Sequence, residues 1–219
     1  MREVRRSADR FLTVGDGTVT RHSFSYGAHY DPANVRFGPL VAINVEHLAP
    51  GSGYPAHRHS DVEIITWVLE GVLRHEDSTG IAGDVGPGVL QRLSAGPGVQ
   101  HTEVNASATD PLVFVQMMLA SDHDGDPEIE QRAVEPSPGV LVATVRVHAP
   151  GRLHVATFRG GETLRVPPAG RHLVHVTRGD VMAGGEGLGA GDELRSDEGG
   201  PLVLSGDGPG EALVWSLDG

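Results

Sequence analysis

Hydrophobic and polar residues alternate in short runs along most of this 219-residue chain, and glycine, proline, aspartate or asparagine separates one run from the next. Alternation with a period of two is the pattern of strands that bury one face. Many such runs at even spacing are typical of all-β sandwiches and barrels. The predicted strands are residues 18–24, 40–47, 63–70, 72–76, 89–93, 99–104, 112–119, 140–147, 153–157, 163–166, 172–177, 201–204 and 211–217.

A polar, turn-rich region divides these runs into two sets. It covers residues 121–131 and 135–139, where aspartate, proline and glycine are frequent, and such stretches are typical of linkers. A chain of this length can form two domains of about 100 residues, each large enough to bury a core. We therefore predict two β domains, residues 1–125 and 126–219, and no long helix.

A glycine-rich stretch at residues 184–191 has the composition of a phosphate-binding loop. Such loops need a helix directly after them, because the helix N-terminus holds the phosphate. No helical pattern follows this stretch, which lies between short predicted strands. We therefore interpret it as a tight connection between strands, where glycine supplies the positive φ angles that such turns require.

Composition and charge exclude several classes of function. The chain has 17 Lys and Arg against 29 Asp and Glu, a net charge of −12, which makes nucleic acids and anionic membranes poor partners. It has no cysteine, so disulfides, thiolate nucleophiles and cysteine metal sites are excluded. The basic N-terminus is not followed by the apolar run that a signal peptide needs. No apolar run in the chain is long enough to span a membrane. We expect a soluble protein of the cytoplasm.

Candidate metal ligands stand in two pairs, His57 with His59 and His101 with Glu103. Side chains two apart in a strand point to the same face, so two such pairs on facing strands of a small barrel can converge on one point. Three neutral imidazoles and one carboxylate suit iron, manganese, cobalt, nickel, copper or zinc. Because histidine must be neutral to bind a metal, the affinity for the metal should decrease as the pH is lowered to ~6.5 and below.

The two segments resemble the metal-binding motifs of the cupin superfamily. They read Gly51-x5-His57-x-His59-x3-Glu63 and Gly98-x2-His101-x3-Asn105. Seven residues separate Glu63 from Gly71, and Ser94-Ala-Gly-Pro-Gly98 precedes the second motif; both variants resemble the pirin family. Further strings similar to that family are His22-Ser-Phe-Ser-Tyr26, Tyr30-Asp-Pro32, Phe37-Gly38, Val68-Leu-Glu-Gly71, His75-Glu-Asp-Ser78 and Gly86-Pro-Gly88.

The resemblance implies a bicupin, two cupin-type β-barrel or jelly-roll domains. It also implies one divalent transition metal per chain, iron before nickel, cobalt, manganese, copper or zinc. The implied ligands are His57, His59, His101 and Glu103. Glu63, a ligand in many other cupins, would instead orient a histidine or balance the charge of the site. Histidines without a paired spacing are expected to be hydrogen-bonded or exposed, namely His22, His29, His47, His75, His123, His148 and His154.

The second domain is expected to be a degenerate, metal-free cupin. His172 and His175 occupy the place of the first motif, but residues three apart on a strand face opposite sides, so one metal cannot bind both. No ligand stands in the segment 202–204, at the place of the second motif. The resemblance to the pirin family implies the same degeneracy.

For function, the resemblance to bacterial pirins implies a quercetin 2,3-dioxygenase-like enzyme. In that reaction a flavonol binds the metal through its deprotonated hydroxyl, and dioxygen cleaves the heterocyclic ring with loss of carbon monoxide. The expected partners are a small aromatic substrate and dioxygen, with Glu103 as ligand or base. One alternative is a non-enzymatic, iron-binding regulatory protein with a protein partner, as eukaryotic pirins imply. Another is a cupin enzyme that acts on a different small molecule.

Two segments depart from the pirin pattern. Gln116-Met-Met118 stands where the family usually has an aromatic residue after the glutamine, and Ile129 stands in place of the usual tyrosine. Methionine adapts its shape to irregular gaps, so we expect Met117 and Met118 to fill the core. These departures bear on the substrate more than on the metal.

Overall fold

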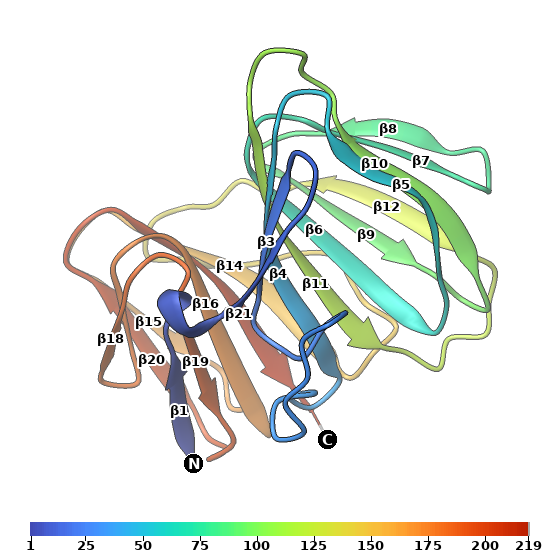
Figure 1. Cartoon of the computed structure of the whole chain (residues 1–219). Helices are drawn as coiled ribbons and strands as arrows, with labels where there is room; N and C mark the ends of the chain where they lie inside the picture. Colours follow the sequence, from blue (N-terminus) through green and yellow to red (C-terminus); the bar gives the residue numbers. More distant parts are fainter. Residues whose placement is uncertain (219) are drawn as a thin grey trace. The chain divides into compact units, whose positions relative to one another are not determined.

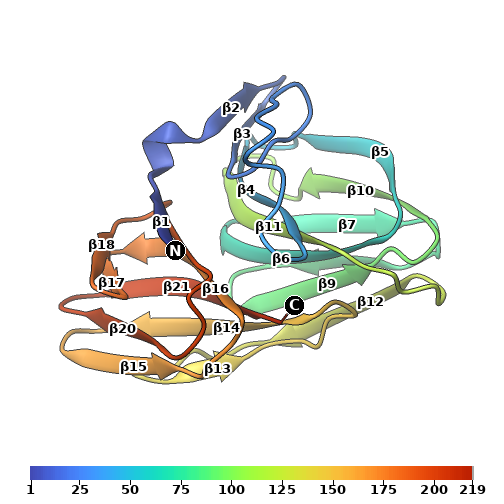
Figure 2. The same ribbon diagram turned by 90° about the horizontal axis from the view of Figure 1, so that it is seen from below.

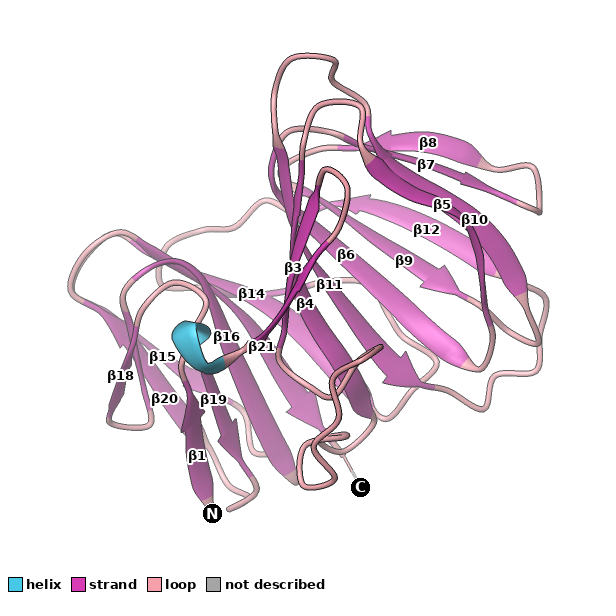
Figure 3. Ribbon diagram, in the orientation of Figure 1, coloured by secondary structure: helices cyan, strands magenta, loops and turns pink. Residues whose placement is uncertain are grey.

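The computed structural model describes residues 1–218, which form two compact units. The larger unit comprises Phe11–Ala133 and Val147–Ala149. The smaller unit comprises Met1–Arg10, Val134–Arg146 and residues 150–218. Almost all regular structure is strand, which confirms the all-β prediction (Figure 3). The described residues contain no helix long and apolar enough to cross a membrane.

Two sheets build the larger unit (Figure 1). The seven-stranded sheet has the order β12-β9-β6-β11-β4-β3-β2, and the four-stranded sheet has the order β5-β10-β7-β8. Their strands are β2 (Phe11–Val14), β3 (Thr18–His22), β4 (Leu40–Leu48), β5 (Gly53–His59), β6 (Val62–Glu70), β7 (Leu73–Asp77), β8 (Ala82–Val85), β9 (Val89–Ser94), β10 (Val99–Asn105), β11 (Leu112–Ala120) and β12 (Glu128–Ala133).

A shared apolar core joins these two sheets. Leu48, Val68 and Phe114 from the larger sheet pack in one buried cluster with Leu73 and Val85 from the smaller one. The period-two pattern of β10 explains how a polar site can coexist with this core. Every second side chain of that strand is buried between the sheets, and these positions include His101 and Glu103.

The smaller unit also has two sheets (Figure 2). The first has the order β1-β19-β16-β21-β14-β13 and the second β15-β20-β17-β18. Their elements are β1 (Arg2–Arg5), η1 (Ser7–Asp9, a 3-10 turn), β13 (Leu141–Ala143), β14 (Gly151–Phe158), β15 (Glu162–Val166), β16 (Arg171–Gly179), β17 (Val181–Ala183), β18 (Glu186–Leu188), β19 (Glu193–Ser196), β20 (Leu202–Gly206) and β21 (Gly210–Leu217).

The division of the chain differs from the expected one at 125/126. The predicted linker overlaps strand β12 at residues 128–131. This strand pairs with β9 from Glu128 opposite Ser94 to Ala133 opposite Val89, so the larger unit extends to residue 133. Residues 1–10 belong to the smaller unit, because β1 pairs with β19. Both pairings join segments far apart in sequence, and local composition carries no signal of them.

The glycine-rich stretch is a tight connection between strands, as predicted. β17 and β18 pair as antiparallel strands around Gly184 and Gly185. These two glycines have φ angles of 57° and 92°. A two-residue hairpin turn with positive φ at both positions favours glycine there.

Candidate metal centre

Strands β5 and β10 bring the three predicted histidine ligands together. The antiparallel register sets His57 opposite His101, and His59 lies two residues from His57 on the same face. Ring centroids are 4.4 Å apart for His57 and His101, 4.9 Å for His57 and His59, and 5.0 Å for His59 and His101. One potential ligand atom from each ring lies within 4.8 Å of the other two.

The hydrogen bonds of these rings leave one nitrogen of each available to a metal. Nδ1 of His57 lies 2.8 Å from the carbonyl oxygen of Pro55, so this nitrogen carries the proton and donates. Nε2 of His59 and Nε2 of His101 are buried and have no hydrogen-bond partner. Buried polar atoms are normally paired. Three imidazoles with a free nitrogen at one point fit a divalent transition metal.

Glu103 lies beside this cluster and is fully buried. Its carboxylate belongs to a second group of potential ligands, formed with His75 and His101. Nε2 of Gln116 on β11 donates to both carboxylate oxygens at 2.9 Å. Burial raises the pKa of Glu103 to about 7; the hydrogen bonds from Gln116 oppose the shift and the charge of Glu46 adds to it.

An irregularity in the pairing of β5 with β10 adjusts the ligand positions. The register shifts between His101, opposite His57, and Glu103, opposite Tyr54. Beyond it the two backbones approach so closely that a Cβ atom on Gly53 would lie 2.2 Å from the carbonyl oxygen of Glu103. A glycine at position 53 therefore allows the strand to carry Glu103 at its observed place.

The structure gives the partners of two buried residues near the ligands. Glu63, which was expected to orient a histidine or to balance the charge of the site, is fully buried and accepts a hydrogen bond from Ser94 Oγ at 2.9 Å. The side chain that contacts His101 is His75, whose Nδ1 lies 3.3 Å from Nδ1 of His101. His75 is hydrogen-bonded, as expected for it, but its place beside a candidate ligand was missed.

Burial changes the acidity of two candidate ligands. It lowers the pKa of His59 to about 4, and repulsion from His57 adds to this shift. It lowers the pKa of His101 to about 3, and the neighbouring histidines add to this shift. Both rings are therefore neutral, the form that binds a metal, well below the usual range of histidine titration.

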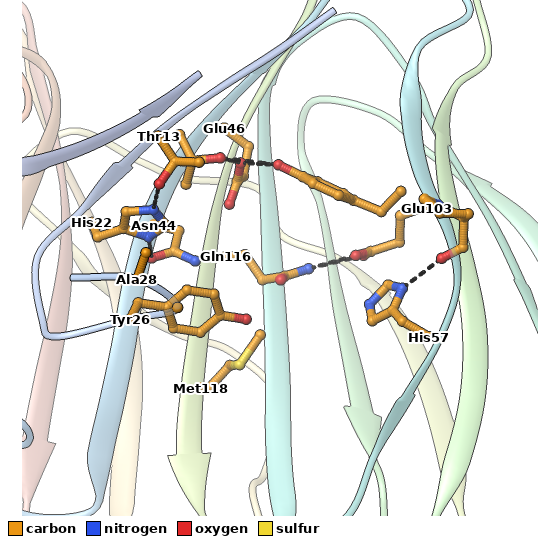
Figure 4. A pocket seen from close by; sticks show the side chains of 14 residues that line it. Thr13, His22, Tyr26, Ala28, Asn44, Glu46, His57, Glu103, Gln116 and Met118 are labelled. Atoms are coloured by element: carbon orange, nitrogen blue, oxygen red, sulfur yellow. Dashed lines mark hydrogen bonds between the residues drawn. The ribbon is translucent and has the colours of Figure 1, made fainter. Parts of the chain in front are cut away.

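A cavity of about 340 Å³ opens beside the cluster, and His57 and Glu103 form part of its wall (Figure 4). This volume is near the lower end of the roughly 300–1,000 Å³ typical of small-molecule sites. Met118 is buried in the core, as predicted, and also lines the cavity. The lining residues are Thr13, Thr20, His22, Tyr26, Gly27, Ala28, Asn44, Glu46, Tyr54, Pro55, His57, Glu103, Gln116 and Met118.

A second carboxylate lies in this wall, at Glu46 on β4. The hydroxyl groups of Tyr54 and Thr20 donate to its Oε2 at 2.6 and 2.5 Å. Burial raises the pKa of Glu46, although these hydrogen bonds and one from Asn44 oppose the shift. This residue was not predicted from the sequence. The signal was a pair of polar residues two apart, Asn44 and Glu46, within an otherwise apolar strand.

Another group of ligand-type residues in the larger unit fits a metal poorly. His123, Glu128 and His148 lie close together, but the two rings are stacked with centroids 4.0 Å apart and planes at 11°. Lone pairs in parallel ring planes do not converge on one ion. Glu128 also accepts a hydrogen bond from Arg92 at 3.0 Å.

In the smaller unit the two histidines of β16 take separate partners. Nε2 of His172 lies 2.9 Å from the carbonyl oxygen of Pro167. Nδ1 of His175 lies 2.9 Å from the Arg10 guanidinium, which also pairs with Glu193 at 3.3 Å. Burial, with repulsion from Arg10, lowers the pKa of His175 to about 3. The position of the first motif in this unit thus holds a buried polar network.

Comparison with known proteins is consistent with this site. The crystal structure of the bacterial pirin YhhW from Escherichia coli in complex with nickel(II) matches with a TM-score of 0.93 and 27% identity, over 100% of this chain and 99% of that one. A nickel-bound relative and the histidine cluster together support a divalent metal here.

Sequence relatives cover nearly the whole chain. A Mycobacterium tuberculosis protein, named provisionally as a quercetin 2,3-dioxygenase, is 38% identical over 98% of this chain and 94% of its own length. The quercetin 2,3-dioxygenase of E. coli K12 is 30% identical over 90% of each protein. The family model described as Pirin matches residues 3–119. The chain therefore belongs to the pirin family.

Proposed function

We propose that this protein is a metal-dependent dioxygenase of quercetin-like flavonols. The observation that carries the proposal is that His57 of the histidine cluster and Glu103, which shares a second group of potential ligands with His101, both form part of the wall of the cavity. A structural metal site is closed by its protein ligands, whereas a catalytic site keeps a side open to substrate. Relatives named quercetin 2,3-dioxygenase support the same chemistry.

The proposed ligands are His57, His59, His101 and Glu103. The free Nε2 atoms of His59 and His101 and the bond from His57 to Pro55 support the three histidines. When bound, a divalent metal supplies Lewis acidity that lowers the pKa of a coordinated substrate hydroxyl. Iron is the first metal to test, followed by nickel, cobalt, manganese, copper and zinc.

Glu103 is the proposed acceptor of the substrate's hydroxyl proton. It lies at the boundary between the ligand cluster and the cavity, and its burial keeps bulk water away from the carboxylate. Gln116 donates to both of its oxygens and so restricts its rotation. A base must lie within hydrogen-bond reach of the proton it takes, and Glu103, in the cavity wall beside the histidines, would be the carboxylate next to a substrate bound in the cavity.

The charge of the cavity favours a neutral substrate rich in hydroxyl groups. Glu46 and Glu103 contribute two carboxylates, and the described residues that line the cavity include no lysine or arginine. Anionic substrates such as carboxylic acids or phosphates would meet repulsion. Polyphenols carry hydroxyl groups that can donate hydrogen bonds to the two carboxylates and to the oxygen of the Asn44 amide. The rings of His22 and Tyr26 offer apolar surface to the aromatic rings of such a substrate.

The test is oxygen uptake with quercetin by protein loaded in turn with each of the six metals. We expect flavonol loss and oxygen consumption together, both absent in His59→Ala, whose side chain is a proposed ligand outside the cavity wall. His172→Ala, in the smaller unit, is the matched control and should keep full activity. Fully metallated protein that consumes no oxygen would favour the iron-binding regulatory alternative. Turnover of a different small molecule would favour another cupin reaction.

A further inference from the structure

Strand β7 places two buried polar side chains next to His101. His75 and Asp77 lie two residues apart, and their side chains are 0% and 1% exposed. Nε2 of His75 lies 3.2 Å from Oδ2 of Asp77, and Nδ1 of His75 lies 3.3 Å from Nδ1 of His101. A continuous chain of hydrogen bonds thus runs from a carboxylate to a proposed metal ligand.

The Asp77 end of this chain is fixed by backbone contacts. Its Oδ1 accepts hydrogen bonds from the backbone N–H groups of Thr79 and Ile81 and from the Thr79 hydroxyl. Burial would raise the pKa of Asp77, but these hydrogen bonds and the one from His75 outweigh it and lower the pKa. An ionised carboxylate only accepts hydrogen bonds, so Nε2 of His75 must carry the proton in this contact.

The proton on Nε2 of His75 determines which nitrogen is protonated in each of the two rings, His75 and His101. A neutral His75 protonated at Nε2 has a lone pair at Nδ1, which can only accept. Nδ1 of His101 must then be the donor, and the lone pair of His101 falls on Nε2. That atom is buried without a partner, and it is therefore the nitrogen that His101 can offer to the group it forms with His57 and His59. Both nitrogens of His75 are already engaged, so it is placed to orient a ligand and not to be one.

We infer that His75 and Asp77 are positioning residues, which hold His101 in the tautomer and orientation that binds the metal. The inference rests on the proposed metal site. Partners of this kind raise ligand basicity and fix ring orientation, and their loss typically lowers metal affinity about 10- to 100-fold. No direct contact of either residue with metal or substrate is needed.

The variant Asp77→Asn tests this inference because the backbone dictates how an amide would sit. The amide oxygen must face the N–H groups of Thr79 and Ile81, which leaves the NH2 group toward Nε2 of His75. His75 would then be protonated at Nδ1, and His101 at Nε2, the nitrogen needed for the metal. The matched control is Glu76→Gln, an exposed carboxylate on the same strand.

The first measurement is the tautomer of both histidines in metal-free, 15N-labelled protein, from two-bond 1H–15N correlation spectra. We expect the Nδ1–H form of His101 in the wild type and in Glu76→Gln, and the Nε2–H form in Asp77→Asn. The second measurement is Ni²⁺ affinity by chelator competition. We expect Asp77→Asn to bind about 10- to 100-fold more weakly and Glu76→Gln to match the wild type.

A second pair of variants covers the case in which Asp77→Asn does not fold. His75→Phe removes the acceptor facing His101 and should lose the same affinity, whereas His75→Asn places an amide oxygen near the position of Nδ1 and should recover most of it. Wild-type His101 in the Nε2–H form, or equal Ni²⁺ affinity in His75→Phe and His75→Asn, would overturn the inference. Absence of Ni²⁺ binding by the wild type, with the expected tautomers, would overturn the proposed metal site instead.

Discussion

His57 and His101 face each other across the β5–β10 pair, with ring centroids 4.4 Å apart. With His59 they offer three imidazole nitrogens to one point, so removal of any one should abolish stable binding of a single metal. We expect His57→Ala, His59→Ala and His101→Ala to lose stoichiometric metal and Glu103→Ala to retain part of it. The measurement is metal content per chain by elemental analysis.

The matched controls for this prediction are His172→Ala and His175→Ala. Both side chains are as buried as His101 but belong to the smaller unit. They should leave the metal content unchanged. Stoichiometric metal in the double variant His57→Ala/His101→Ala would contradict the assignment.

Metal release on acidification should begin at lower pH than ordinary histidine chemistry implies. The pKa of His59 is lowered to about 4 and that of His101 to about 3, chiefly by burial. Protons therefore compete with the metal for these rings only well below ~6.5, the unperturbed pKa. We expect retention of the metal at pH 5.5 to 6 in the presence of a chelator. Loss with a midpoint near 6.5 would show that the rings titrate as exposed histidines.

The same pKa shifts set the sign of the stability change in the metal-free protein. The unfolded chain binds protons at these histidines from about pH 6.5 downward, whereas the folded chain binds them only near pH 4 and below. The contribution of His59 and His101 to the free energy of unfolding should thus fall as pH drops through this window. In urea unfolding of the metal-free proteins, the free energy of unfolding should decrease less from pH 7 to pH 5 in His101→Gln than in the wild type.

The ligand pairs could be predicted from sequence because their geometry is local. In a strand, a spacing of two fixes a common face, and this predicted that His57 and His59 would lie together. The pair His75 and Asp77 has the same spacing, yet it lies outside the motifs that identified the ligands and was not predicted. Its role depends on the pairing of β7 with β10, which sequence alone does not give.

Other features depend on contacts that local patterns do not encode. The pairing of Arg2 with Ser196 assigns the first ten residues to the smaller unit, and no composition signal links those segments. Glu46 was not predicted as a functional residue, because Tyr54 and Thr20, which donate hydrogen bonds to it, come from other strands. Strand existence was therefore predictable, and the polar wall of the cavity was not.

Glu103→Gln should separate binding of the metal from turnover. The amide keeps the size of the side chain and can still coordinate weakly, but it cannot accept a proton. We expect the oxygen-uptake rate with quercetin to fall by about 100-fold or more, the range of general-base contributions, with a smaller loss of metal. Equal loss of metal and of rate per chain would limit Glu103 to the role of ligand.

Glu46 and Tyr54 should affect substrate binding without affecting the metal. Tyr54 donates to Glu46 at 2.6 Å in the cavity wall, and neither residue belongs to the ligand groups. Hydrogen bonds to a charged group contribute about 1.5–3 kcal/mol, so Glu46→Gln should raise KM for quercetin roughly tenfold or more. Tyr54→Phe should have a smaller effect in the same direction. An unchanged KM in both variants would exclude this wall as the binding surface.

Gly53 should be essential to the pairing of β5 with β10. An added Cβ would lie 2.2 Å from the carbonyl oxygen of Glu103 and 2.6 Å from Cα of Val104, both backbone atoms that cannot move independently. Gly53→Ala should therefore destabilise the fold by about 1–3 kcal/mol or more, the range of overpacking, and displace Glu103 from the ligand cluster. Gly86→Ala is the matched control, because a Cβ there meets nothing within 4 Å. Urea unfolding and metal content of the two variants give the answer: wild-type values for Gly53→Ala would mean that the close approach does not constrain the site.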